Sequence, residues 1–213
     1  MFSFYPRLAN QTVIVNLTID KLSAAGVFKK AMKKEEYLDI YQQIMDSDYS
    51  HEIELAEQLA YKLISPYIFA DEVIWFICSS SMKEEVARKI EKRVLLAIER
   101  KQPIYPRYLK HKQKAKAIQY IYDNKDRLYV EWLRSEDQLT YLETLPHIGP
   151  ITKYHLAKNL GIDVIKPDRH LVRIAKSYGM DPLEMCDNLK KETGHPLVVI
   201  DTVIWRAANL GWK

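Results

Sequence analysis

The chain has 213 residues, of which 47% are hydrophobic and 28% are charged, and this composition excludes an intrinsically disordered protein. Its net charge of +4 is a mild excess, which indicates an anionic partner only if the positive groups gather on one face. Two cysteines, Cys78 and Cys186, are too few for a disulfide framework and cannot by themselves hold a zinc ion or an iron-sulfur cluster, so we expect no metal and no cofactor.

The N-terminal segment and the hydropathy pattern indicate the compartment. The sequence contains no run of about 18 apolar residues, the length needed to cross a bilayer. The start MFSFYPRLANQ lacks the basic and apolar regions of a signal peptide. We therefore expect a cytoplasmic protein without membrane contact, associated with the nucleoid if it is bacterial. Residues 1–19 contain the β-branched run TVIVNLTI, which could form one short strand or an extended arm.

The rest of the chain is predicted to be helical. Six glycines and nine prolines interrupt a sequence rich in Leu, Ile, Ala, Lys and Glu, which favours long helices with short connections. Apolar spacings of three and four predict helices at 20–45, 51–64, 71–79, 83–101 and 111–128, and two more between 181 and 213 around a turn at 194–196. The serines at 79–81 predict a loop, and four lysines lie at or near the start of helix 111–128. The predicted fold class is all-α.

Two further helices are predicted around a short turn within LPHIGPITKYHLAKNLG at 145–161. The segment at 136–145 has a helical pattern, and Pro150 is well placed as the first residue of the second helix. The turn PHIGP joins them, with Ile148 pointing inward as an anchor. Unpaired amides at the start of the second helix are suited to holding a phosphate, and Lys153 could add a charge contact. Gly-Pro turns between helices are common, so this turn alone leaves a purely structural role open.

Asp168 closes the loop GIDVIKPD and opens a helix over DRHLVRIAKSYG. Pro167 forces Lys166 toward an extended conformation, and aspartate is among the preferred caps of a helix N-terminus. Capping alone accounts for this aspartate. The local sequence therefore leaves a structural role and a catalytic role open.

The combination of LPHIGPIT with PDRHLVRIA, separated by a helix and a short loop, resembles the core signature of the helix-hairpin-helix (HhH-GPD) DNA glycosylase superfamily, the endonuclease III-like base-excision enzymes. Two weaker similarities lie upstream: DEVIWFICSSSMKEEVARK resembles the family's early helix and DNA-wedging loop, and QKAKAIQYI resembles a helix with an Asn-Lys-Ala-like pattern. The resemblance covers roughly residues 50–210. It implies two helical lobes with a DNA- and base-binding cleft between them. One lobe is expected from 20–68 with 169–213 and the hairpin lobe from 69–168, after an N-terminal extension at 1–19.

Three departures from the family pattern restrict the chemistry. The family's first hairpin glycine is His147 here, so the turn must tolerate a side chain at that place. Bifunctional members carry a lysine nucleophile at the position of Ile151, which cannot form a Schiff base, and Lys153 lies about 200° further around the helix. No cysteine follows Cys186, so the four-cysteine cluster of many relatives is absent. The resemblance therefore implies a monofunctional glycosylase without an iron-sulfur cluster.

The implied partner is double-stranded DNA that contains a damaged or modified base, which the protein, expected to be a monomer, flips out before hydrolysing its N-glycosidic bond. Asp168 takes the family's catalytic position, where a carboxylate stabilises the oxocarbenium-like transition state and orients or deprotonates water. The expected DNA contacts are His147, Gly149, Ile151, Thr152, Lys153, Ser81, Met82, Lys114 and Arg173. The candidate aromatic faces of a base pocket are Trp75, Tyr105, Tyr108, Trp132 and Trp205.

Two other functions stay open. A protein that keeps the hairpin without chemistry would bind DNA and scan or mark damage, which His147 and Ile151 make possible. A bifunctional glycosylase and lyase would need a lysine from elsewhere in the chain. The sequence does not identify the target base, although the missing lysine favours alkylated or otherwise weakened bases over oxidised guanine.

Overall fold

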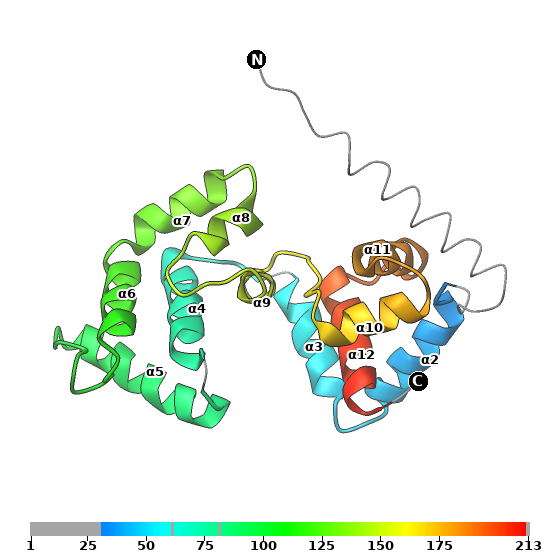
Figure 1. Ribbon diagram of the computed structural model, residues 1–213, viewed down its shortest axis with the longest axis horizontal. Helices are drawn as coiled ribbons and strands as arrows, with labels where there is room; N and C mark the ends of the chain where they lie inside the picture. The colour runs from blue at the N-terminus through cyan, green and yellow to red at the C-terminus, as the bar shows by residue number, and fades with distance from the viewer. Residues whose placement is uncertain (1–30, 61, 81, 212–213) are drawn as a thin grey trace, which may run out of the picture. The chain divides into compact units, whose positions relative to one another are not determined.

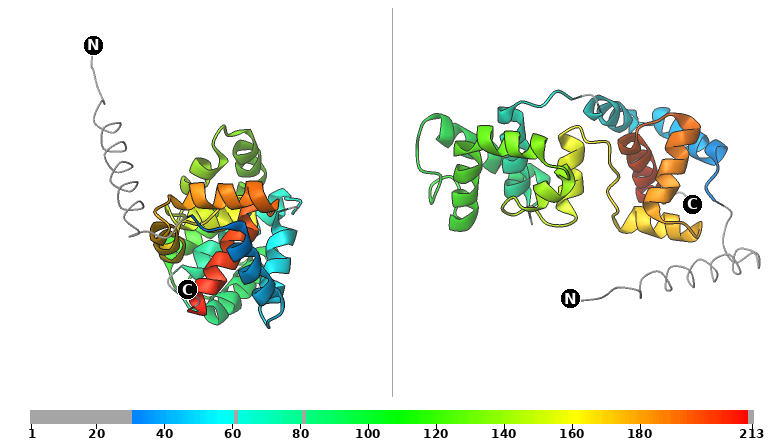
Figure 2. Two further views of the ribbon diagram at one scale, coloured as in Figure 1. Left: turned by 90° about the vertical axis from the view of Figure 1, so that its right-hand side faces the viewer. Right: turned by 90° about the horizontal axis from the view of Figure 1, so that it is seen from above.

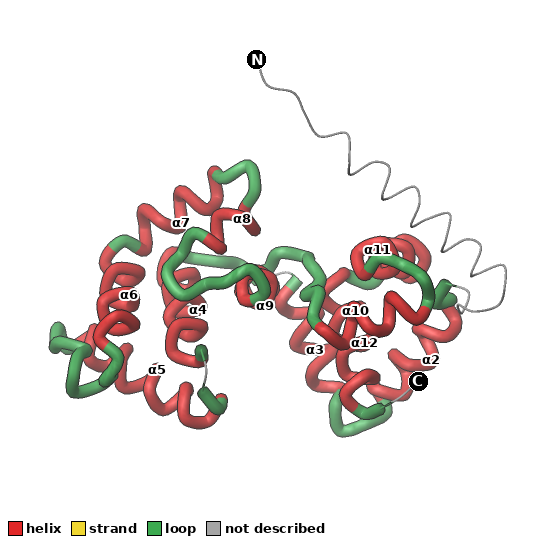
Figure 3. The backbone as a smooth tube through the Cα atoms, in the orientation of Figure 1, coloured by secondary structure: helices red, strands yellow, loops and turns green. Residues whose placement is uncertain are grey.

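The computed structural model describes residues 31–60, 62–80 and 82–211, and every regular element within them is a helix (Figures 1 and 3). The helices are labelled α2 to α12 as in Figure 1. The all-α prediction is therefore confirmed for this part of the chain. The strand or arm expected within residues 1–19 lies outside the described residues, as does the first part of the helix expected at 20–45.

The chain divides into two compact units (Figure 2). The central unit comprises Leu55–Lys166, and the terminal unit combines Met1–Glu54 with Pro167–Lys213. The chain thus passes from the central to the terminal unit one residue before Asp168. The hairpin and the aspartate that the sequence singles out consequently belong to different units.

Helix α4 (Pro66–Ser79) is the centre of the central unit. It packs against α5 (Glu84–Glu99), α6 (Lys112–Asp123), α7 (Lys125–Arg134) and α9 (Thr152–Asn159). A helix with neighbours on several sides buries side chains all round, which explains why its sequence PYIFADEVIWFICS is mostly apolar rather than amphipathic. The short helix α8 (Gln138–Glu143) packs against α7 and α9 and completes the unit.

Three predicted helix boundaries are wrong. Helix α3 (Ser50–Leu59) ends before residue 64, and α4 starts at Pro66 instead of 71, because the Ser65 Oγ accepts a hydrogen bond from the Ile68 amide at 3.3 Å. Proline at the first helical position costs no hydrogen bond. The helix predicted at 111–128 is two helices, since α6 ends at Asp123 and the side-chain amide of the next residue, Asn124, donates to the Tyr120 carbonyl at 2.9 Å.

Helix α12 (Leu197–Asn209) is the centre of the terminal unit and is buried along most of its length. It packs against α2 (Lys34–Met45), α10 (Arg169–Ser177) and α11 (Pro182–Thr193). The Arg206 Nε donates to the Glu52 carboxylate at 2.8 Å, which ties α12 to the first turn of α3. The two helices predicted around 194–196 are confirmed as α11 and α12, and Gly194 between them has a φ of 77°.

Gly161 is a position where the central unit requires glycine. Its φ is 78°, in the left-handed region that residues with a side chain rarely adopt. A Cβ placed there would lie 3.2 Å from the Lys62 carbonyl oxygen and 3.3 Å from the Leu59 carbonyl oxygen. Both neighbours are backbone atoms and cannot rotate away. Gly161 therefore lets the end of α9 pass close to the segment that follows α3.

Replacing Gly161 by alanine is expected to lower the free energy of unfolding by about 1–3 kcal/mol, because the new side chain adds left-handed strain and crowds two carbonyl groups. The midpoint of urea-induced unfolding of the full chain measures the change. Gly149→Ala is the matched control, since a Cβ there meets no heavy atom within 4 Å and its φ is not positive. A loss of equal size in the two variants would contradict the assigned role of Gly161.

Candidate functional site

The hairpin of the central unit joins α8 to α9, and these two helices pack against each other. Ile148 lies in the turn with 5% of its surface exposed, so the predicted inward anchor is confirmed. The Ile148 amide donates to the Leu145 carbonyl at 3.2 Å, and the Lys153 amide donates to the Gly149 carbonyl at 3.0 Å. These bonds hold the turn in one shape at the start of α9.

His147 adopts a left-handed backbone conformation with a φ of 67°. Glycine is the usual residue in this region, and histidine is among the side-chain-bearing residues found there more often than average. The turn therefore tolerates a side chain at the place where the family pattern has glycine. Gly149 differs from it, because its φ is not positive and a Cβ there would meet open space. Because Gly149 has no side chain, no side-chain atom covers the backbone of the turn at this residue.

The start of α9 leaves amide groups without acceptors. The amides of Gly149, Ile151 and Thr152 donate to no backbone carbonyl of the described chain, and no side chain caps the helix. Ile151 is 50% exposed beside them. Several amides facing outward at a helix N-terminus favour a negatively charged group.

Lys153 pairs with a residue of the preceding helix. Its Nζ lies 2.6 Å from the Glu143 Oε2, and only 14% of the lysine side chain is exposed. The hydrogen bond to this carboxylate raises the pKa of Lys153. The ammonium is therefore charged and held across the hairpin. That Lys153 contacts a phosphate or is a solvated charge stays a prediction from the sequence.

Lys114 is buried, with 7% of its surface exposed, at the start of α6. Its Nζ donates to the Ser80 carbonyl at 2.9 Å, so the lysine holds the loop between α4 and α5. Burial lowers the pKa of Lys114. Met82 in this loop is 38% exposed, and Ser81 lies outside the described residues. Of the loop residues expected to wedge into DNA, Met82 is thus the one that offers an exposed apolar side chain.

Asp168 caps α10 in the terminal unit. Its Oδ1 accepts hydrogen bonds from the amides of His170 at 2.8 Å and Leu171 at 3.2 Å, as the sequence predicts for a capping residue. No described residue donates to its other carboxylate oxygen, Oδ2, and the side chain is half-buried. Arg173 is exposed and forms no ion pair with any described residue, Asp168 included. One oxygen thus fixes the carboxylate while the other stays available.

The five aromatic candidates for a base pocket have different surroundings. Trp132 is a core residue, 3% exposed, with its ring centroid 5.3 Å from that of Phe69. The Arg88 guanidinium covers one face of Trp75 at 3.5 Å from the ring centroid. The remaining three range from half-buried to exposed: Tyr108 donates to the Gln102 side chain, Tyr105 is 43% exposed, and Trp205 lies 4.8 Å from the Arg206 guanidinium in the terminal unit.

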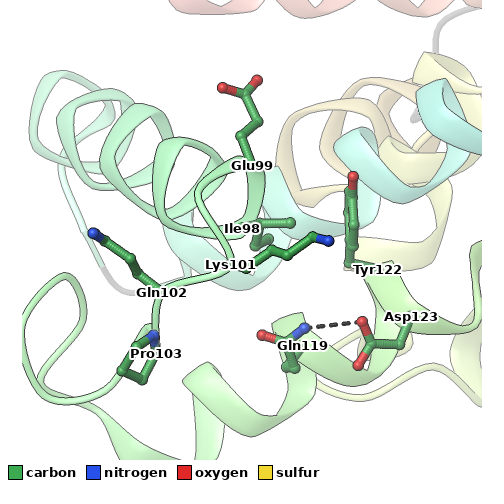
Figure 4. Close-up of a pocket in the computed structure, with 8 residues that line it drawn as sticks. All are labelled: Ile98, Glu99, Lys101, Gln102, Pro103, Gln119, Tyr122 and Asp123. Carbon is green, nitrogen blue, oxygen red and sulfur yellow. Dashed lines mark hydrogen bonds between the residues drawn. The ribbon is translucent and has the colours of Figure 1, made fainter.

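A pocket of about 590 Å³ lies between α5 and α6 in the central unit (Figure 4). Its wall includes a hydrogen bond from the Gln119 Nε2 to the Asp123 Oδ1 at 2.9 Å. The lining residues are Ile98, Glu99, Lys101, Gln102, Pro103, Gln119, Tyr122 and Asp123. None of the residues predicted for the site lines it, and no sequence pattern pointed to it.

Comparison with protein-family models, with curated proteins and with solved structures finds no match. Among the described residues, no group of three or more His, Cys, Asp and Glu side chains has an arrangement that could hold a metal ion. Within the same residues, no helix is both long enough and apolar enough to cross a membrane.

Asp168→Ala is expected to lower the free energy of unfolding by about 1 kcal/mol, because two amides at the start of α10 lose their acceptor. Asp168→Asn keeps an oxygen in the capping position and loses only the interaction of the charge with the helix dipole, about 0.5 kcal/mol. Thermal unfolding of the three proteins measures the difference. If alanine were tolerated as well as asparagine, the cap would contribute nothing to stability.

Proposed function

We propose that this protein is a DNA glycosylase of the helix-hairpin-helix superfamily that acts in base excision repair. In this proposal the two units are the family's two helical lobes, and damaged DNA binds in a cleft between them. The observation that carries the proposal is the carboxylate of Asp168, which capping fixes through Oδ1 while Oδ2 has no donor in the described chain. The uncapped start of α9 supports it, because its outward amides suit a DNA phosphate.

The proposed reaction is hydrolysis of the N-glycosidic bond of a base that has been flipped out of the duplex. As this bond breaks, positive charge develops on the sugar, and the Asp168 carboxylate stabilises it. The same carboxylate orients the water that attacks the anomeric carbon. Because the capping amides fix the carboxylate before the substrate arrives, little reorganisation is needed during the reaction.

The proposed chemistry is monofunctional. Ile151 stands where bifunctional relatives have their lysine, and an isoleucine side chain cannot form a Schiff base. Lys153, two residues later, is charged and paired with Glu143 at 2.6 Å, so its amine is not a ready nucleophile. The product is therefore an abasic site in an intact strand.

Asp168→Asn is expected to lower the excision rate at least about 100-fold, because the transition state loses the stabilising charge. Duplexes that contain uracil, alkylated purines, oxidised guanine or modified cytosines serve as substrates, and alkali-labile sites report excision. Affinity for an undamaged duplex should stay within about twofold of the parent, because the asparagine keeps the cap.

Three outcomes would redirect the proposal. A mutant as active as the parent would remove Asp168 from the reaction. If the parent binds duplex DNA and excises none of the four lesion classes, the favoured function becomes that of a hairpin DNA-binding protein without chemistry, with which the departures at His147 and Ile151 agree. Borohydride reduction should trap no covalent DNA adduct, and a trapped adduct would establish a lysine nucleophile elsewhere in the chain.

Gly149→Ala is expected to weaken binding of an undamaged duplex about tenfold without loss of stability, because a methyl group on the bare turn keeps a phosphate away from the amides. Fluorescence anisotropy at one fixed salt concentration measures the affinity. The unfolding midpoint of the variant is its internal control. Unchanged affinity would mean that the α9 start does not hold the DNA backbone.

A further inference from the structure

Three nitrogen-bearing side chains gather between the hairpin and the start of α6. The ring centroids of His111 and His147 lie 6.3 Å apart with an interplanar angle of 87°. Lys114, one helical turn after His111, is buried, whereas both histidines are exposed. No described carboxylate pairs with any of the three, and none acts on the charge of His147. A concentration of potentially positive groups without an acid is unfavourable unless an anion binds there.

The hydrogen bonds indicate which nitrogen atoms of the three side chains can donate to a ligand or accept a proton. The His111 Nδ1 accepts from the Lys114 amide at 3.2 Å, so this nitrogen carries no proton and the ring donates through Nε2. The Lys114 Nζ spends one of its three donors on the Ser80 carbonyl. His147 makes no hydrogen bond to any described residue. It is therefore the member of the cluster that can take up a proton without breaking a bond.

The surroundings disfavour the protonated form of His147 in the free protein. Partial burial, followed by repulsion from Lys114 and, when its ring is protonated, from His111 on α6, lowers the pKa of His147 below its usual value. A bound anion would raise the pKa of His147, because the anion interacts favourably with the imidazolium and offsets the positive charge of Lys114. Binding of an anion and protonation of His147 should consequently favour each other.

We propose that His111, Lys114 and His147 form a site for one phosphodiester group, and that its binding draws a proton onto His147. The protonated ring and the His111 Nε2–H donate to phosphate oxygens, while the nearby Lys114 ammonium contributes positive charge. The inference rests on the proposed function, since it identifies this phosphodiester as part of the DNA backbone. It goes further by making DNA binding depend on pH through one named side chain.

The sign of the pH dependence follows from these states. His147 has a lowered pKa in the free protein, and a bound anion should raise it. Affinity should therefore rise as the pH falls through the pKa of the complex, and should stop rising below the pKa of the free protein. If the pKa of His147 differs by about one unit between the free protein and the complex, the dissociation constant is about tenfold smaller below both pKa values than above them.

The test measures the pKa of His147 by NMR of the histidine rings in the full chain, with the resonance assigned from the spectrum of His147→Asn. Three samples are compared: protein alone, protein with inorganic phosphate, and protein saturated with an undamaged DNA duplex. Phosphate and duplex should each raise this pKa, and the duplex by about one unit. Duplex affinity is then measured from pH 5.5 to pH 8 at constant ionic strength.

Two variants separate the histidines. Asparagine tolerates the left-handed conformation at 147, so His147→Asn should fold normally and lose most of the pH dependence of duplex affinity. His111→Asn keeps a side-chain cap on α6 and should bind more weakly with the pH dependence retained.

The outcomes distinguish this inference from the proposed function. If the His147 pKa is the same in all three samples, or if His147→Asn keeps the parent's pH dependence, the phosphodiester site is overturned even though DNA binds. If phosphate raises the pKa while the parent binds no duplex, the anion site is supported and the glycosylase proposal fails.

Discussion

The first turn of every α-helix leaves amide groups without acceptors inside the helix, and the proposed function depends on how two helices of this chain meet that requirement. At α10, Asp168 accepts from two of these amides through one oxygen. At α9, no side chain caps the first turn, and the amides of Gly149, Ile151 and Thr152 find no backbone acceptor in the described chain. One helix start thus fixes a carboxylate, while the other is left suited to an anion. The proposed hydrolysis of an N-glycosidic bond in DNA would use both kinds of group, a negative charge for the sugar and donors for the phosphate.

The sequence predicted those parts of the fold that depend on neighbouring residues. The inward position of Ile148, the cap at Asp168 and the turn at 194–196 each follow from residues within one or two turns of helix. The boundaries between α3 and α4 and between α6 and α7 did not follow. Helix α4 is buried against several neighbours and therefore has apolar residues on several sides. Its sequence lacks the amphipathic periodicity from which a helix start is predicted.

The lysines show why the site was harder to predict than the fold. Lys114 and Lys153 have the charge and the positions expected of phosphate contacts, yet each donates to a protein group. The partner of Lys114 is the Ser80 carbonyl, 34 residues away, and such a contact exists only after α4 and α6 have packed together. A sequence indicates which side chains carry charge, but burial decides which of those charges remain for a ligand.

His147 shows what the resemblance to the glycosylases preserves. The glycosylase pattern that the sequence resembles has glycine at this position, and the backbone of His147 has a φ of 67°, a conformation in which glycine is the usual residue. The requirement of the hairpin is therefore conformational, and histidine meets it at the cost of some strain. In return the turn gains an imidazole that faces His111 at the start of α6. The histidine thus departs from the glycosylase pattern by residue type, adopts the conformation typical of glycine, and adds a titratable group where the proposed DNA backbone would lie.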